Sequence, residues 1–144
     1  MNFLNVGEAR RRAAAAEAEG ELLPDAKLQG ALILVIEDEP LIALDLSASL
    51  RDAGARVVQA ANVEGALAAI EAHACSAAVL DFRLGVETGR AVARRLKKKR
   101  VPFLYYSGRA LDDLTTGSGA PVISKPAGSR EIVGMLRLLI DGKR

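Results

Sequence analysis

The feature that most constrains the fold of this chain is a short, uninterrupted apolar run that ends in acidic residues. The run reads Ala31-Leu-Ile-Leu-Val-Ile36, and three acidic residues and Pro40 follow it. Short runs rich in branched apolar side chains are typical of strands buried on both faces, as in parallel sheets covered by helices. Pro40 suits the first turn of a helix. We therefore expect a buried strand that leads directly into a helix, with carboxylates at the junction.

The alternation of strand and helix continues along the chain. Further strands are expected at residues 56–60, 76–80, 101–106 and 121–124. Helices are expected from Pro40 to Gly54, after Asn62, from Gly89 to Lys99, at residues 110–114 and after Ser129. In the first of these helices, apolar residues recur at helical spacing: Leu41, Ile42, Leu46 and Leu50. Asn62 and Ser129 are the expected N-caps, and a loop holds Gly85 and Gly89. This order predicts a doubly wound α/β domain with a parallel sheet and right-handed crossovers.

Residues 1–30 differ in composition from the rest of the chain. The segment from Glu8 to Leu23 is rich in Ala, Arg and Glu, which favour a helix, and Pro24 follows it. Its apolar side is mostly alanine and would bury little surface. Both a solvated, fraying helix and a docking or dimerisation helix remain open. We expect an N-terminal helical extension over residues 1–30 and one domain over residues 31–144.

Polar side chains follow four of the expected strands at the point where each strand ends. These residues are Glu37, Asp38, Glu39, Asp81, Ser107 and Lys125. The carboxyl ends of parallel strands meet at one edge of the sheet, where function collects in such folds. We therefore expect carboxylates, a hydroxyl and an ammonium group to converge there.

This set of side chains suits phosphoryl transfer. Clustered carboxylates raise one another's pKa unless a cation joins them, and hard oxygen ligands suit Mg²⁺. One carboxylate could then act as a nucleophile and form an acyl phosphate. A transferred phosphoryl group needs a metal ion, an ammonium group and small donors around it. Asp38 and Asp81 could bind the metal, while Lys125 and Ser107 supply the ammonium group and the hydroxyl.

Four short motifs resemble the signature segments of bacterial response-regulator receiver domains, the CheY-like family. They read Val35-Ile-Glu-Asp-Glu-Pro40, Val79-Leu-Asp-Phe82, Tyr106-Ser-Gly108 and Ser124-Lys-Pro126. The set is specific because all four appear in order at strand ends, and the resemblance covers residues 31–141. It implies a flavodoxin-like fold with strand order 2-1-3-4-5. It also implies a stand-alone, single-domain response regulator of two-component signal transduction.

The resemblance implies a role for each matching position. Asp81 would accept the phosphoryl group from a sensor histidine kinase or a phosphotransfer protein. The Mg²⁺ cofactor would be held by Glu37, Asp38, Asp81 and the backbone carbonyl of Arg83. Lys125 would contact the phosphoryl oxygens, Ser107 would be the switch hydroxyl, and Gly108 the small residue that keeps the site open. The bond before Pro126 would be cis, at the low cost of X-Pro bonds.

The chain also departs from the family pattern. Val122 stands where the family has a switch aromatic, Ala127 stands where an aromatic is common, and the segment between Ser107 and Lys125 is short. We expect the signalling face near Val122 to be remodelled. Arg83 and Arg109 flank the site, either as solvated surface charges or as residues that modulate the loss of phosphate.

Composition and charge limit the expected partners and compartment of the protein. The formal net charge is only +2, so nucleic acid is not an expected partner, and no stretch is long and apolar enough to span a membrane. The single cysteine, Cys75, fits a reducing compartment, and we expect a cytoplasmic protein. We interpret Lys97-Lys-Lys-Arg100 as a solvated helix end and assign no function to His73.

Two rival functions stay in view. A pseudo-receiver would act as an interaction module without phosphorylation, although all the phosphorylation positions are filled. A haloacid-dehalogenase-like phosphatase would need D-x-D after the first strand, where the chain reads Glu37-Asp38-Glu39. We therefore expect a signalling domain rather than an enzyme, one that at most catalyses its own phosphorylation and dephosphorylation. A homodimer through the N-terminal or the last helix is a hypothesis, and phosphate sink, relay and kinase regulator remain open.

Overall fold

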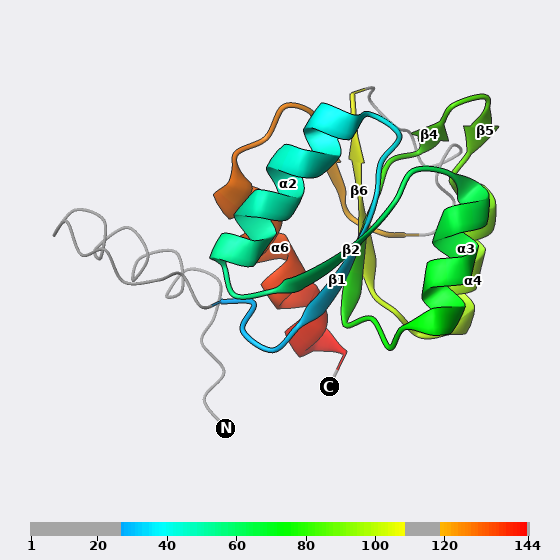
Figure 1. Ribbon diagram of the computed structural model, residues 1–144. Coiled ribbons are helices and arrows are strands. Elements are labelled where there is room, and N and C mark those ends of the chain that lie inside the picture. Colours follow the sequence, from blue (N-terminus) through cyan, green and yellow to red (C-terminus); the bar gives the residue numbers. More distant parts are fainter. Residues whose placement is uncertain (1–26, 109–118, 144) are drawn as a thin grey trace, which may run out of the picture.

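The structure is a computed structural model that describes residues 27–108 and 119–143 (Figure 1). The helix expected between Glu8 and Leu23, the short helix expected at residues 110–114 and Arg109 all lie outside these residues.

A parallel five-stranded sheet forms the centre of the described domain. Its strands, in the spatial order β2-β1-β3-β6-β7, are β2 (Arg56–Ala60), β1 (Leu32–Ile36), β3 (Ala77–Leu80), β6 (Phe103–Ser107) and β7 (Val122–Ser124). Counted along the main sheet alone, this is the order 2-1-3-4-5. The predicted flavodoxin-like fold is therefore confirmed.

Helices cover both faces of the sheet (Figure 1). On one face lie α2 (Pro40–Asp52) and α6 (Ser129–Gly142), and on the other lie α3 (Val63–Ala72) and α4 (Arg90–Lys98). Strand β1 serves both faces because successive side chains point to opposite sides. Ile33 and Val35 pack in the cluster beneath α2 and α6, whereas Leu34 and Ile36 pack beneath α3 and α4. The uninterrupted apolar run is thus explained by burial on both sides.

The second helix begins and ends where the sequence indicates. Pro40 is its first residue, and Gly54, just after the C-cap, has a φ of 94°. That left-handed conformation favours glycine, and a Cβ there would lie 2.7 Å from Gln29 Oε1. Leu46 and Leu50 are buried as their spacing indicates, but Leu41 is 79% exposed. Leu41 therefore lies on the solvent side of the helix.

Helix capping confirms one prediction and corrects another. Asn62 is the N-cap of α3, and its side chain accepts a hydrogen bond from Gly65 N at 2.7 Å. The prediction that Ser129 caps the last helix is wrong. Ser129 is already the first helical residue, and the extended N-cap is Gly128, which has no side chain to accept a hydrogen bond.

The loop expected after the third strand contains a small hairpin. Strands β4 (Arg83–Leu84) and β5 (Glu87–Thr88) pair antiparallel. The chain then enters α4 through Gly89, where a Cβ would lie 3.0 Å from the carbonyl oxygen of Asp81. A side chain at this position would push that carbonyl away by a few tenths of an ångström, so glycine fits best here. Among the described helices, none has the length and apolarity needed to cross a membrane.

Candidate functional site

Backbone pairing brings the predicted site residues to one edge of the sheet. Asp81 N donates to Ile36 O at 2.9 Å, which places Asp81 beside Glu37 on the neighbouring strand end. On the other side, Lys125 N donates to Ser107 O at 2.8 Å. The residues just beyond β1, β3 and β7 therefore meet at one edge with Ser107, the last residue of β6, as the sequence predicts.

Three carboxylates form the centre of this edge. Glu37, Asp38 and Asp81 each offer an oxygen, and these atoms all lie within 4.8 Å of one another. Glu37 and Asp81 are only 4% and 7% exposed, whereas Asp38 is more open to solvent. Like charges this close repel one another, so a cation or a bound proton stabilises the cluster.

Lys125 supplies a cation within the protein itself. Its Nζ lies 2.6 Å from Glu37 Oε2 and 3.0 Å from Asp81 Oδ2. Burial acts to lower the pKa of Lys125, but the hydrogen bonds to Glu37 and Asp81 outweigh it and raise the pKa above its usual range. The ammonium group is therefore held charged between the two buried carboxylates.

Burial has the opposite consequence for Glu37. Desolvation raises the pKa of Glu37 to about 7, although the hydrogen bonds from Lys125 and from Glu39 N act to lower it. The charge of nearby Asp81 contributes to this rise in the pKa. The protonation of Glu37 therefore changes near neutral pH.

Neighbouring backbone groups fix the two aspartates. Gly85 N, in the turn of the β4–β5 hairpin, donates to Asp38 Oδ2 at 3.0 Å. Arg83 N donates to Asp81 Oδ1 at 3.3 Å, while the Arg83 side chain is exposed. The hairpin that sequence reasoning missed therefore orients the carboxylate of Asp38. The sequence signal for the turn of this hairpin was the glycine at position 85, whose φ of 66° lies in the region that favours glycine.

Tyr106 is a further residue that sequence reasoning did not place at the site. The Lys125 ammonium lies 5.5 Å from the centroid of its ring, a distance at which cation–π attraction operates. Ala127 N donates to the Tyr106 hydroxyl at 3.2 Å, just after the Lys125–Pro126 bond, which is cis as predicted. Tyr106 thus supports both Lys125 and the turn that follows it.

The remaining predicted positions lie around this centre. Ser107 is buried, and Gly108 is exposed with no described atom within 4 Å of where a Cβ would stand. Val122 lies in β7, the outermost strand of the sheet, where it pairs with Tyr105 of β6, and it is 38% exposed. Arg109 lies outside the described residues.

Comparison with known families decides the identity of the domain. Residues 33–137 match the family model of the response regulator receiver domain. The chain belongs to this family. Two transcriptional regulatory proteins of Mycobacterium tuberculosis are similar in sequence: TcrA is 34% identical over 119 residues, and the probable regulator TcrX is 30% identical over 118. Each alignment covers 78% of this chain but only 47% and 50% of the relative. The receiver chain thus spans about half the length of the curated relatives it matches.

Solved receiver structures share the fold. The receiver domain of a sensor histidine kinase from Pseudomonas aeruginosa, solved with a magnesium ion in its active-site cleft, matches with a TM-score of 0.71 and 28% identity. The match covers 78% of this chain and 98% of that domain. A response regulator receiver protein from Sinorhizobium medicae gives a TM-score of 0.74 and 26% identity, covering 81% and 99%. Receiver domains are signalling domains of two-component systems, and this chain is one of them.

Proposed function

We propose that this receiver accepts a phosphoryl group on Asp81 in a Mg²⁺-dependent reaction and signals through partner proteins. The observation that carries the proposal is the position of Asp81. Its carboxylate is buried, lies 3.0 Å from the Lys125 ammonium, and has two further carboxylates within 4.8 Å. A nucleophile beside both a cation and a metal-binding cluster suits phosphoryl transfer.

The transfer has a simple balance. A carboxylate oxygen of Asp81 forms a bond to phosphorus as the bond between phosphorus and a donor's histidine nitrogen breaks, and the electron pair stays on the imidazole. The product is an acyl phosphate on Asp81. Lys125 is placed to neutralise charge on the phosphoryl oxygens, and Ser107 lies on the adjacent strand end with a hydroxyl to donate.

The residues present fit a magnesium ion. Glu37, Asp38 and Asp81 offer only hard oxygen donors, which is the ligand class that Mg²⁺ prefers, and the Arg83 carbonyl is proposed as a further ligand. A magnesium ion in a receiver cleft is also present in the Pseudomonas aeruginosa relative. When bound, Mg²⁺ would offset the negative charge of the carboxylates and of the incoming phosphoryl group.

Partners follow from this chemistry. A sensor histidine kinase or a phosphotransfer protein is the proposed donor, and the reducing cytoplasm, which suits the single Cys75, is the proposed compartment. The proposed role is signalling rather than turnover of a substrate, with homodimerisation as one candidate output.

Val122 replaces the family's switch aromatic, so the output proposed here does not use a rotating ring at that position. Gly108 is proposed to keep the site open, and Arg83 and Arg109 to modulate the loss of phosphate.

Replacing Asp81 tests the proposed function directly. Wild-type protein, incubated with acetyl phosphate and Mg²⁺, should gain the mass of one phosphoryl group by intact mass spectrometry. Asp81→Asn should gain none, because the amide is not a competent nucleophile, while the matched variant of an exposed aspartate, Asp45→Asn, should behave as wild type. Failure of the wild type to gain phosphate from either acetyl phosphate or a histidine kinase would favour the pseudo-receiver. Rapid, catalytic hydrolysis of acetyl phosphate would favour the phosphatase.

A further inference from the structure

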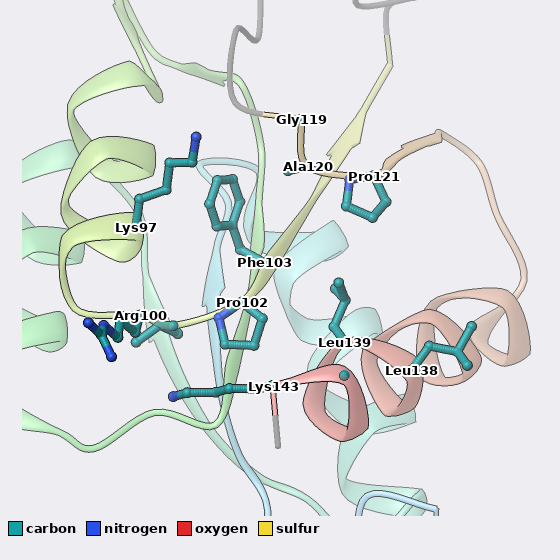
Figure 2. Close-up of a pocket in the computed structure, with 12 residues that line it drawn as sticks. Lys97, Arg100, Pro102, Phe103, Gly119, Ala120, Pro121, Leu138, Leu139 and Lys143 are labelled. Carbon is teal, nitrogen blue, oxygen red and sulfur yellow. The ribbon is translucent and has the colours of Figure 1, made fainter. Parts of the chain in front are cut away.

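An open pocket lies at the edge of the sheet opposite the carboxylate cluster. Figure 2 shows the residues that line it. It is formed where the chain enters β6 and β7 and where α4 and α6 end, and its volume is about 480 Å³. That volume is within the range of known ligand pockets, roughly 300–1,000 Å³. We call it the basal groove. None of the residues assigned to the phosphorylation site lines it.

The basal groove has two chemically different sides. In the view of Figure 2, Lys97, Arg100 and Lys143 lie along one side, and Pro121, Leu138 and Leu139 lie along the other. The apolar side is not sealed by the fold, because Leu138 is 38% exposed. The groove thus presents an apolar wall and a row of cations to the same occupant.

The three cations have no acidic partner among the described residues. The nearby acidic side chains are already paired: Glu71 with Arg95 and Lys99, and Asp141 with Arg137. Exposed Arg94 and Lys98 on α4 add to the positive charge on this end of the molecule. Unpaired cations in a cluster attract an anionic partner and steer its approach.

The backbone at Arg100 is a second, independent observation. Arg100 follows the C-cap of α4 with a φ of 58°, the left-handed conformation that glycine and asparagine adopt most easily. An arginine at this position is strained, and strained residues concentrate at functional sites. This strained residue lines the basal groove and contributes its guanidinium group to the wall.

We propose that the basal groove binds an amphipathic acidic segment of a partner protein, with apolar side chains against Leu138 and Leu139 and carboxylates toward Lys97, Arg100 and Lys143. A small molecule fits less well, because such sites enclose most of the ligand and aim buried polar groups at it, whereas this groove is open and its three cations are exposed to solvent. A membrane fits less well because the apolar wall exposes little surface: Leu138 is 38% exposed, and Pro121 and Leu139 are half-buried. Nucleic acid fits less well because the wall offers leucine and proline rather than exposed rings for stacking.

The test uses the full chain and a random dodecapeptide display library. The expected result is enrichment of peptides that combine Asp or Glu with Leu, Ile or Phe. Binding of the best peptide should fall roughly tenfold in the double variant Lys97→Gln/Arg100→Asn, as the loss of two ion pairs predicts. Asparagine tolerates the left-handed conformation, so this variant should fold at least as well as wild type.

A charge-matched control separates the groove from the general charge of α4. Arg94→Gln/Lys98→Gln removes the same two charges outside the lining and should weaken binding much less than the groove variant does. Enrichment of basic or neutral peptides, equal loss of binding in both double variants, or no enrichment at all would overturn the proposal. So would tighter, groove-dependent binding to a DNA duplex or to vesicles containing phosphatidylglycerol, or self-association abolished by the groove variant. Asp81→Asn should bind the peptide as wild type does, which separates this inference from the proposed phosphorylation.

Discussion

Glu37 is the residue at which the chemistry of the site should respond to pH. Its pKa is raised to about 7 by burial, so in the metal-free protein a proton occupies this carboxyl below neutral pH. A bound cation favours the ionised form, so Mg²⁺ bound at the proposed site would displace that proton. The apparent affinity for Mg²⁺ should rise from pH 6 to pH 7 and flatten above pH 8. Isothermal titration calorimetry at several pH values measures this directly.

The matched variant for this prediction is Glu37→Gln. The amide keeps the size of the side chain and an oxygen acceptor for Lys125, but it cannot titrate. Its affinity for Mg²⁺ should be lower at pH 8 and should change little between pH 6 and pH 8. An equally steep pH dependence in the variant would assign the titration to another group.

Lys125 should be the residue on which the metal-free site depends most. Its ammonium group contacts Glu37 and Asp81, both buried. Lys125→Ala leaves two buried carboxylates without a cation, a loss on the order of 3 kcal/mol in the free energy of unfolding. Urea denaturation in the presence of a chelator should show this loss, and added Mg²⁺ should restore part of it. Lys98→Ala, on an exposed lysine, is the control and should change the free energy of unfolding little. A loss that Mg²⁺ does not reduce would contradict the electrostatic explanation.

At the scale of single elements, the N-cap of α3 has a measurable contribution to stability. Asn62 accepts a hydrogen bond from Gly65 N at 2.7 Å and satisfies a backbone donor that has no partner within the helix. Asn62→Ala should lower the free energy of unfolding by about 1 kcal/mol. Asn62→Ser, which restores a side-chain oxygen, should recover most of that loss in the same urea titration. Equal losses in both variants would exclude the cap as the cause.

The elements also show where sequence reasoning succeeds and where it stops. Strand β1 was predictable because burial on both faces leaves a continuous apolar run. The β4–β5 hairpin was not, since strands of two residues carry no periodicity. The exposure of Leu41 was missed because helical spacing alone does not say how wide the buried face is. The N-cap at Ser129 was misplaced by one residue, as helix ends commonly are.

At the scale of the whole molecule, sheet topology accounts for how much of the site could be predicted. The rule that parallel strands end at one edge was enough to bring Glu37, Asp38, Asp81 and Lys125 together from sequence. It could not give the direct contacts of Lys125, because these depend on side-chain directions and burial. It also could not find two supporting contacts. The ring of Tyr106 lies beneath the Lys125 ammonium group, and Gly85 N donates a hydrogen bond to the Asp38 carboxylate.

The contacts of the turn before β1 are another property at this scale that sequence patterns did not reveal. Leu28 lies in the segment assigned from sequence to the N-terminal extension, yet its side chain is fully buried in the cluster beneath α2 and α6. Its backbone N donates to Ala53 O at 2.8 Å, and Arg137 from α6 donates to the carbonyl of Lys27 at 2.9 Å. The turn before β1 is therefore tied to two helices of the domain.

Truncating Leu28 tests whether this turn belongs to the same cooperative unit. Leu28→Ala should lower the free energy of unfolding by about 2–5 kcal/mol, because it leaves a cavity in a packed core. Leu41→Ala removes the same atoms from an exposed position and should change it by less than about 0.5 kcal/mol. Both are measured by urea denaturation monitored by circular dichroism. If Leu28→Ala were as mild as Leu41→Ala, the turn would be an appendage, and the domain would begin at β1. A large loss with an unchanged m-value would instead show that residues 27–30 unfold together with the rest of the domain in one two-state transition. The m-value is informative here because it reports the surface exposed on unfolding.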